Sequence, residues 1–188
     1  MIKIGITGSL ASGKSTASKF LSYKRGPLFS ADTAVKELYK NKSFKSLICK
    51  KFKINNNNRI KKSLRETIVG NIKNIKKLEK IIHPLVRKKM RKFTSQHRDK
   101  KLLFYEIPLL VESRLMKYFE VIIFIKAKRQ IRLKRFILKQ GEKKLFNLLN
   151  SKQMKDEKKI KLCDHVVVNE KNLNMLKRNL SVIITRYE

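Results

Sequence analysis

The chain is poor in cysteine and has no long apolar run. Its two cysteines, Cys49 and Cys163, lie far apart and have neither C-x-x-C nor histidine-paired spacing, which argues against a disulfide scaffold or a zinc cluster. We expect both thiols to be reduced and at least partly buried. The longest apolar stretches, such as 121–125, are too short to cross a bilayer. These absences favour a soluble globular protein.

Acidic residues and tryptophan are also scarce. There are 14 Asp and Glu against 48 Lys and Arg, which gives a formal net charge of +34, and there is no tryptophan. Such a charge raises nucleic acid as a partner. The lysines are spread along the whole chain, however, and come with many Asn and Ile residues, which indicates a bias of composition rather than a binding patch. We therefore expect no specific nucleic-acid partner, only nonspecific adhesion to polyanions at low salt.

The length of 188 residues allows a sizeable core and predicts one domain. Met1 leads directly into the apolar run 2–7, which leaves no room for a signal peptide, so the expected location is the cytoplasm. The sequence has no coiled-coil heptad or other assembly signal, and the oligomeric state stays open.

Residues 8–15 read Gly-Ser-Leu-Ala-Ser-Gly-Lys-Ser, directly after an apolar run and before a helical pattern. This matches the G-x-x-x-x-G-K-[ST] phosphate loop, whose backbone N–H groups and helix N-terminus face a phosphate. We expect Lys14 to reach the β- and γ-phosphates and the Ser15 hydroxyl to ligate Mg²⁺. A chance glycine-rich turn is the alternative, but the position between strand and helix favours ATP or GTP binding. The expected nucleotide-binding residues here are Ala11, Ser12, Gly13, Lys14, Ser15 and Thr16.

Apolar runs rich in β-branched residues alternate with helical patterns along the chain. Continuous apolar strands separated by helices are typical of a parallel sheet covered on both faces. The sequence therefore predicts an α/β fold with the phosphate loop at the carboxyl edge of the sheet. The expected strands are 2–7, 28–30, 102–107, 121–125 and 165–168.

Two intervals contain no expected strand. Residues 33–98 show helical periodicity that is interrupted by the four asparagines at 55–58, a turn or surface loop, and by Pro84, so we expect a helical lobe with a helix break at the proline. Residues 139–158 are charged, contain Gly141 and are expected to form a mobile lid. The core then comprises residues 1–32, 99–138 and 159–188, closed by a helix within 172–187.

Further segments occur in an order and spacing that resemble the dephospho-coenzyme A kinase family over nearly the whole chain. They are Ser-Ala-Asp (30–32), Leu64-Arg65, Leu-Glu-Lys-Ile-Ile-His-Pro-Leu-Val (78–86), Glu-Ile-Pro-Leu-Leu-Val-Glu (106–112), Leu133-Lys134-Arg135, Gln-Met-Lys-Asp-Glu-Lys (153–158) and Cys-Asp-His-Val-Val-Val-Asn (163–169). The resemblance implies a P-loop NTPase fold with a helical acceptor lobe and a lid. It also implies transfer of the γ-phosphoryl group of ATP, with Mg²⁺, to the ribose 3′-hydroxyl of dephospho-coenzyme A.

The resemblance assigns Asp32 to the acceptor hydroxyl, whose proton a carboxylate can accept or orient. From the residues alone, an N-cap for a helix that starts at Thr33 is an equal alternative. The family usually has Asp-Ala-Asp here, whereas this chain has Ser30, so the contribution of the first carboxylate is missing or replaced.

Glu106 stands at the end of an expected strand, where the family more often has Asp. A carboxylate there can act on magnesium through water or on the acceptor, and a solvated strand end is the alternative. Pro108 and Leu109 are expected to set the turn into the next helix, and the resemblance implies a place for them in the acceptor pocket.

His83, Arg65 and Arg87 are the expected acceptor-binding residues of the helical lobe. His83 either faces the acceptor or caps a broken helix. Guanidinium groups can hold the phosphates of the acceptor, although any single Arg on such a basic chain can simply be solvated. The family's Leu-Asp-Arg appears here as Ile60-Lys61-Lys62, which weakens the transfer of roles in this segment.

Lys139 is the expected catalytic cation of the lid, at the position where the family has Arg two residues before the glycine. A lysine is a point charge rather than a bidentate fork, and Arg135, one helical turn earlier, is a candidate to compensate. Asn169 matches a family position near the adenine, with a strand-end turn as the alternative.

Three other interpretations remain open at this point. One is another nucleoside or nucleotide kinase of the P-loop class, in which Asp32 and His83 would lose their assigned roles. Another is a nucleic-acid-stimulated ATPase, suggested by the charge. The third is a noncatalytic binder, suggested by the departures at Ser30, Glu106 and Lys139.

Overall fold

The computed structural model describes residues 1–55 and 60–188, without the side chains of Lys61, Val69 and Ile72. The strands are β1 (Ile2–Gly8), β2 (Leu28–Ser30), β3 (Leu102–Glu106), β4 (Val121–Lys126) and β5 (His165–Val168). The helices are α1 (Lys14–Ser22), α2 (Ala31–Leu38), α3 (Lys42–Phe52), α4 (Ile60–Gly70), α5 (Ile72–Gln96), the 3-10 turn η1 (Met116–Tyr118), α6 (Arg129–Leu138), α7 (Lys143–Lys152), α8 (Asp156–Ile160) and α9 (Leu173–Ile184). Of the asparagine run expected to form a turn, residues 56–58 lie outside the described part of the chain.

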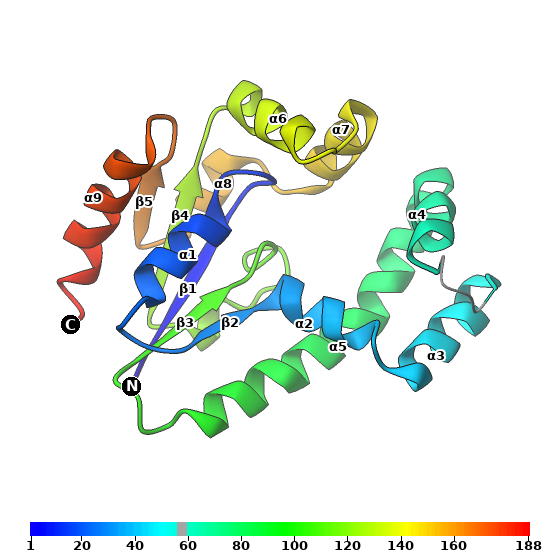
Figure 1. The fold of residues 1–188 in the computed structure, drawn as a ribbon, viewed down its shortest axis with the longest axis horizontal. Helices are drawn as coiled ribbons and strands as arrows, with labels where there is room; N and C mark the ends of the chain where they lie inside the picture. Colours follow the sequence, from blue (N-terminus) through cyan, green and yellow to red (C-terminus); the bar gives the residue numbers. More distant parts are fainter. Residues whose placement is uncertain (56–59) are drawn as a thin grey trace. The chain divides into compact units, whose positions relative to one another are not determined.

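The strands form one parallel sheet in the order β2-β3-β1-β4-β5 (Figure 1). The predicted α/β fold, a parallel sheet flanked by helices, is therefore confirmed. β1 is central, and Ile6 is in register with Glu106 of β3 while Gly8 is in register with Ile125 of β4. Because the strands all run the same way, the segments that follow β1, β3 and β5 meet at one edge of the sheet.

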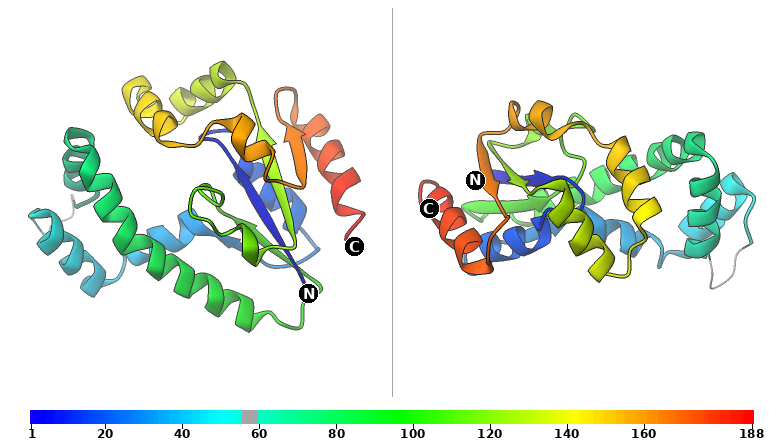
Figure 2. Two further views of the ribbon diagram at one scale, coloured as in Figure 1. Left: turned by 180° about the vertical axis from the view of Figure 1, so that it is seen from behind. Right: turned by 90° about the horizontal axis from the view of Figure 1, so that it is seen from above.

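The two faces of the sheet are covered by different parts of the chain. Helices α1 and α9 lie together on one face (Figures 1 and 2) and bury their apolar sides in one core with the strands. α9 is the C-terminal helix expected within 172–187. On the other face, Gly5 of β1 leaves room for Leu110 and Phe119, because a Cβ there would lie 2.7 Å from Leu110 Cδ1 and 3.2 Å from Phe119 Cγ. The segment after β3 is thereby packed directly on β1.

The chain divides into two compact units, residues 1–30 with 96–188, and residues 31–95. The regular secondary structure of the described part of the second unit is all helical, and α2 to α5 supply its apolar core. The buried members of this core are Leu38, Phe44, Ile48, Phe52 and Leu64.

The predicted helix break at Pro84 is wrong, because α5 continues through it from Ile72 to Gln96. A proline inside a helix costs roughly 3 kcal/mol, since it removes one N–H and crowds the preceding turn. Five apolar residues on both sides of Pro84 are partly buried against the same core, and each contributes a share of the about 1.5–3 kcal/mol that full burial of an aliphatic side chain gives. Packing therefore outweighs the local cost of the proline. The residues concerned are Leu78, Ile81, Ile82, Leu85 and Val86.

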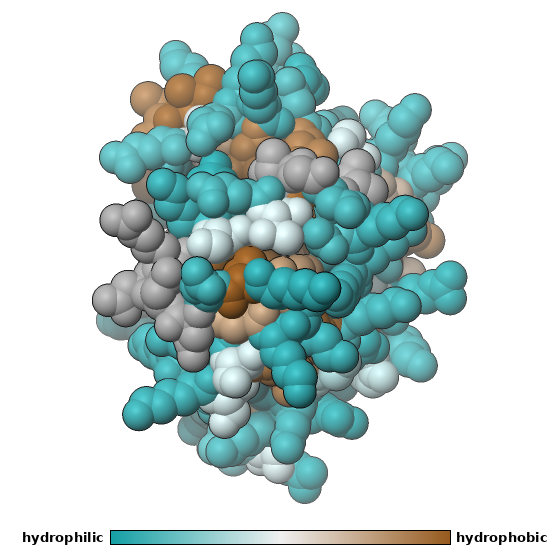
Figure 3. Space-filling view, turned by 90° about the vertical axis from the view of Figure 1, so that its right-hand side faces the viewer, coloured by the Kyte–Doolittle hydropathy of each residue, from teal (hydrophilic) through white to brown (hydrophobic). Residues whose placement is uncertain are grey.

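The surface matches the composition. The face drawn in Figure 3 is covered largely by hydrophilic side chains. Among the described residues, no helix is both long and apolar enough to span a membrane. Cys49 is buried, Cys163 is partly buried, and both are free thiols, as expected.

Candidate active site

The loop between β1 and α1 depends on two glycines for its shape. Gly8 (φ 148°) and Gly13 (φ 99°) both have positive φ angles that other residues rarely adopt. A Cβ on Gly8 would lie 2.4 Å from the carbonyl oxygen of Ile125, and a Cβ on Gly13 would lie 2.2 Å from Asn169 Nδ2. The backbone therefore passes so close to β4 and to Asn169 that no side chain fits at either position.

The loop winds tightly into the first turn of α1. Ser12 N donates to Ser9 O and Thr16 N donates to Gly13 O, each over 3.1 Å. Gly13 is the N-cap residue of α1 and provides no side-chain cap. A helix start of this kind directs backbone donors and a partial positive charge toward the loop, which is the usual way in which proteins bind phosphate.

Lys14 begins α1 and lies beneath the loop rather than in solvent. Its side chain is buried, and Nζ donates to the carbonyl oxygen of Ser9 over 2.8 Å. Because the lysine side chain is long and flexible, its Nζ can move from the carbonyl oxygen of Ser9 to a phosphate oxygen without a change in the backbone. The predicted phosphate lysine is thus held at the loop.

Ser15 and Glu106 meet at the carboxyl edge of the sheet. Ser15 Oγ donates to Glu106 Oε1 over 2.5 Å, and Glu106 is only 5% exposed. The alternative that Glu106 is a solvated strand end is wrong, because the register of β3 against β1 turns its carboxylate inward beside α1. This contact brings the hydroxyl expected to bind magnesium against a buried carboxylate.

The chemistry of these two oxygens fits Mg²⁺. Magnesium prefers hard oxygen ligands and is usually held by one or two carboxylates together with substrate phosphates. Within the described residues, no group of three or more His, Cys, Asp or Glu could hold a metal ion by itself. The ligands of a magnesium ion here would therefore come from Ser15, Glu106 and a bound nucleotide.

Asn169 and Arg135 both contact the loop from the side of β4 and β5. Asn169 Nδ2 donates to Ser12 O over 2.8 Å, and Arg135 Nη1 donates to the same oxygen over 3.4 Å. Asn169 is positioned because its own N–H continues the sheet pairing to Lys126 O over 2.8 Å. The alternative, that Asn169 only forms a turn at the end of the strand, does not account for its contact with Ser12 O.

Arg132 is a loop-contacting residue that the sequence reasoning missed. It is 6% exposed, and it donates from Nε to Ala127 O over 3.0 Å and from Nη1 to Leu10 O over 3.3 Å and to Asn150 Oδ1 over 2.7 Å. Its spacing from Arg135 was the available signal, because residues three apart on a helix share a face. Burial lowers the pKa of Arg132, which nonetheless stays charged.

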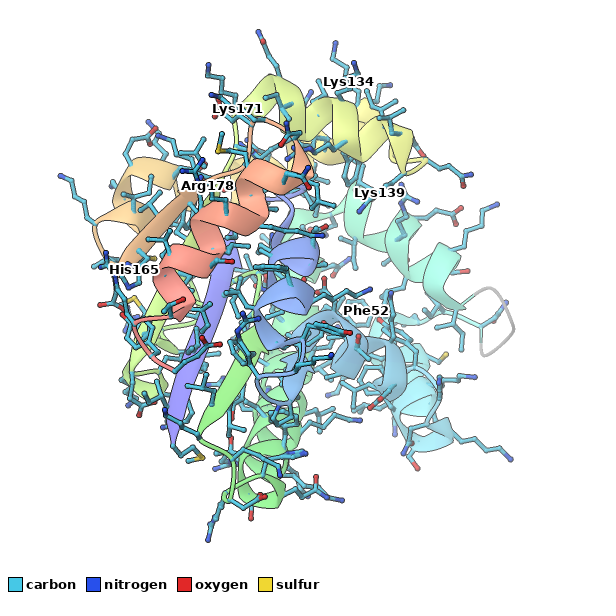
Figure 4. All side chains as sticks on the ribbon, turned by 60° about the vertical axis from the view of Figure 1, so that its left-hand side comes forward. Phe52, Lys134, Lys139, His165, Lys171 and Arg178 are labelled. Atoms are coloured by element: carbon cyan, nitrogen blue, oxygen red, sulfur yellow. The ribbon has the colours of Figure 1, made fainter. Side chains whose placement is uncertain are left out.

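Lys139 lies farther along, as the C-cap residue of α6 (Figure 4), and it is exposed. The contacts from α6 to the loop come from Arg132 and Arg135. The catalytic role of Lys139 therefore stays a prediction.

Pro108 and Leu109 follow β3 beside the end of β1. Thr7 Oγ1 donates to Pro108 O over 3.2 Å, and Leu109 O accepts from Ser113 N over 2.9 Å, so the two residues form the expected turn. Both are partly exposed. Their place in an acceptor pocket stays a prediction.

The remaining expected residues belong to the unit of residues 31–95. Asp32 lies in the first turn of α2, which starts at Ala31, so the alternative that it caps a helix starting at Thr33 is wrong. His83 and Arg87 are one turn apart on α5, where Arg87 Nε donates to His83 O over 3.4 Å. Burial lowers the pKa of His83, which favours the neutral imidazole. Arg65 is exposed on α4.

Comparison with known proteins identifies the family of this chain. A model of the dephospho-CoA kinase family matches residues 2–175. A dephospho-CoA kinase of Bartonella henselae is 36% identical over 186 residues, which cover 96% of this chain and 95% of that protein. A dephospho-CoA kinase of Fusobacterium nucleatum is 34% identical over 178 residues, covering 92% of each.

Solved structures agree in fold. A Thermus thermophilus protein superposes with a TM-score of 0.81 at 26% identity, covering 100% of this chain and 98% of that one. The dephospho-CoA kinase of Campylobacter jejuni gives 0.69 at 25% identity, covering 98% and 96%. A shikimate kinase of Bacteroides thetaiotaomicron, with a TM-score of 0.59 at 12% identity, shares the fold alone. With the family model and these relatives spanning nearly its whole length, the chain belongs to the dephospho-CoA kinase family.

Proposed function

We propose that this chain transfers the γ-phosphoryl group of ATP to the ribose 3′-hydroxyl of dephospho-coenzyme A and so forms coenzyme A, the last step of coenzyme A synthesis. The observation that carries the proposal is the buried contact of Ser15 with Glu106 beside an intact phosphate loop, in a chain of the dephospho-CoA kinase family. Phosphoryl transfer needs charge neutralisation, an in-line acceptor and a group for the acceptor proton. The residues of this chain can supply all three.

The loop and α1 would hold the phosphates of ATP. Backbone N–H groups of residues 11–16 and the start of the helix give fixed partial positive charge, which needs no reorganisation as charge develops. Lys14 would leave Ser9 O, its partner over 2.8 Å, for a β- or γ-phosphate oxygen. Asn169 would lie beside the nucleotide on the Ser12 side of the loop, where it already contacts Ser12 O.

Ser15 and Glu106 would hold a magnesium ion. When bound, the ion neutralises charge on the β- and γ-phosphates. Glu106 would accept from Ser15 or from water in the same place, and its burial keeps this carboxylate fixed.

Asp32 would accept or orient the proton of the 3′-hydroxyl. It comes two residues after the end of β2, in the first turn of α2, where the helix dipole favours the carboxylate form that a base requires. Arg65, His83 and Arg87 would bind the acceptor within a helical lobe at 33–98, together with Pro108 and Leu109 from the core. A neutral His83 suits hydrogen bonding to the acceptor rather than a charge contact.

The segment 139–158 would form the lid. Lys139 would bring a cation to the transferring phosphoryl group, assisted by Arg135, which already contacts the loop. Closure would also exclude water that otherwise hydrolyses ATP. We place the activity in the cytoplasm, without a specific nucleic-acid partner.

An acceptor panel tests this function. ADP release from ATP and Mg²⁺ is measured with dephospho-coenzyme A, with nucleosides, with nucleoside monophosphates and with RNA. We expect release only with dephospho-coenzyme A. Release with a nucleoside or nucleotide alone would assign another kinase activity, and strong stimulation by RNA without a phosphorylated small molecule would assign a nucleic-acid-stimulated ATPase.

A further inference from the structure

Leu10, at the tip of the phosphate loop, is held through both of its backbone groups by residues far along the chain. Its N–H donates to Gln153 Oε1 over 2.9 Å, and its carbonyl oxygen accepts from Arg132 Nη1 over 3.3 Å. Gln153 directly follows α7, and Arg132 lies on α6. Leu10 is therefore held on one side by α6 and on the other by the residue that follows α7, within the expected lid.

Ser9, the preceding loop residue, is held by the same segment. Its hydroxyl donates to Asp156 Oδ1, the first residue of α8. Its carbonyl oxygen accepts from Lys14 Nζ and from Ser12 N over 2.8 Å and 3.1 Å. Asp156 therefore acts on the residue that anchors the phosphate lysine.

Ala11, the residue after Leu10, explains why the loop needs these hydrogen bonds. Ala11 has a φ of 60°, a left-handed conformation that is unfavourable for any residue with a Cβ. Strained backbone persists only where the surroundings hold it. The hydrogen bonds to Ser9 and Leu10 fix the chain immediately before this strained residue.

Residues 153–156, which we call the strap, are held at Met154 and lie between two further anchored residues, Asn150 and Lys159. Arg132 binds Asn150 Oδ1 over 2.7 Å at the end of α7. Beyond Gln153, Met154 N donates to Glu112 Oε1 over 3.2 Å, and the same oxygen lies 2.6 Å from the fully buried Lys159 Nζ of α8. The strap thus connects the segment after β3, which carries Glu112, to the phosphate loop.

We propose that Gln153 and Asp156 are positioning residues that keep the phosphate loop in its nucleotide-binding shape, an inference that rests on the proposed kinase function. Neither needs to touch ATP. Without the strap, the backbone at Ala11 relaxes and a smaller fraction of molecules has the loop in its nucleotide-binding shape. The apparent affinity for ATP falls in proportion to the fraction that keeps this shape. Once ATP is bound the loop is held by its phosphates, so the rate of the chemical step is largely retained.

The first test is made without ligand. Backbone amide exchange is followed by mass spectrometry in peptides that contain Leu10, in the full chain and in Gln153→Ala. We expect faster exchange at Leu10 in this variant, because its N–H loses its acceptor. The control is Glu157→Ala, an exposed neighbour of Asp156 in the same turn of α8, which should exchange like the unmodified chain. Unchanged exchange at Leu10 in Gln153→Ala would overturn the proposal.

The second test measures ATP binding by calorimetry and steady-state rates with dephospho-coenzyme A. The loss of one such hydrogen bond should weaken ATP binding roughly 3- to 10-fold in Gln153→Ala and in Asp156→Ala. KM for ATP should rise in parallel, while kcat and KM for dephospho-coenzyme A stay within about 2-fold. Asp156→Asn should recover most of the affinity, because its amide oxygen still accepts from Ser9.

The outcomes separate the two proposals. If the unmodified chain binds no ATP or does not use dephospho-coenzyme A, the proposed function fails, whatever the exchange at Leu10 shows. If it does both and the two alanine variants bind ATP as Glu157→Ala does, the positioning role fails alone. An Asp156→Asn variant as weak as Asp156→Ala would show that charge, and not the hydrogen bond to Ser9, matters.

Discussion

Removing either member of the Glu112–Lys159 ion pair should destabilise the sheet unit, and the two removals should differ in cost. The Lys159 side chain is 0% exposed and that of Glu112 is 18% exposed, with 2.6 Å between Nζ and Oε1. In the described structure neither Lys159 Nζ nor Glu112 Oε2 has a well-directed hydrogen bond. The ammonium group of Lys159 therefore depends on Glu112, whereas Glu112 Oε1 also accepts from Met154 N. Breaking a buried pair typically costs about 3–5 kcal/mol.

The exposures decide which end of that range applies. Lys159→Met leaves a side chain that is 18% exposed and a carboxylate that keeps the hydrogen bond from Met154 N, so we expect a loss near 3 kcal/mol, or roughly 6–12 °C in Tm. Glu112→Leu leaves an ammonium group without access to water, and its loss should approach about 5 kcal/mol. The double variant leaves no buried charge and should cost far less than the sum of the two single losses.

Urea unfolding followed by far-ultraviolet circular dichroism measures these differences. Lys158→Met is the matched control, because Lys158 is an exposed lysine of the same helix. It should unfold like the unmodified chain. Equal stability of Lys159→Met and Lys158→Met, or additive losses in the double variant, would refute the reasoning.

Four further predictions concern single groups. Lys14→Ala should lower kcat/KM by about 10²- to 10³-fold in the ADP-release assay, through lost charge stabilisation, and a rate near that of the unmodified chain would contradict the site. Glu106→Gln keeps an acceptor for Ser15 but loses the charge, so the Mg²⁺ concentration for half-maximal rate should rise roughly 10-fold, and an unchanged magnesium titration would remove Glu106 from the metal site. Asp32→Asn should lower kcat about 10²- to 10⁴-fold at neutral pH, whereas an unchanged rate would make Asp32 structural. Burial raises the pKa of Cys163 to about 11, so only about one thiol in a thousand is ionised at pH 8 and iodoacetamide should react far more slowly than after unfolding in urea; equal rates would contradict this.

Much of the fold could be predicted because its signals are local. The strands are short apolar runs, of which β1, β4 and β5 are rich in Val and Ile, and the phosphate loop fixes where β1 ends and α1 begins. The helix break predicted at Pro84 was wrong because proline is a strong local signal for the end of a helix. The residues against which α5 packs on both sides of Pro84 are distant in the sequence. Tertiary burial of this kind is invisible to a reading of one segment at a time.

The site residues could be predicted where a sequence motif assigns a role to each position. Lys14 and Ser15 follow from the motif, and Asn169 reaches the loop as its position after β5 suggests. The burial of Glu106 depends on the register of β3 against β1, which the sequence does not state. Arg132 was hidden among the many other Lys and Arg residues of a very basic chain.

Gln153 and Asp156 illustrate a different limit. The family resemblance included their segment without a role for either residue. Their contacts with Leu10 and Ser9 join positions more than 140 residues apart, and a polar side chain that makes one distant hydrogen bond carries no periodic pattern.

The most direct measurement is the identity of the product formed from ATP, Mg²⁺ and dephospho-coenzyme A. Mass spectrometry gives the number of phosphates added, and phosphorus–proton correlation by NMR gives the oxygen that carries the new one. The account predicts one added phosphate, on the ribose 3′-oxygen, formed only when ATP is present. Unchanged dephospho-coenzyme A, or a phosphate on another oxygen, would contradict it.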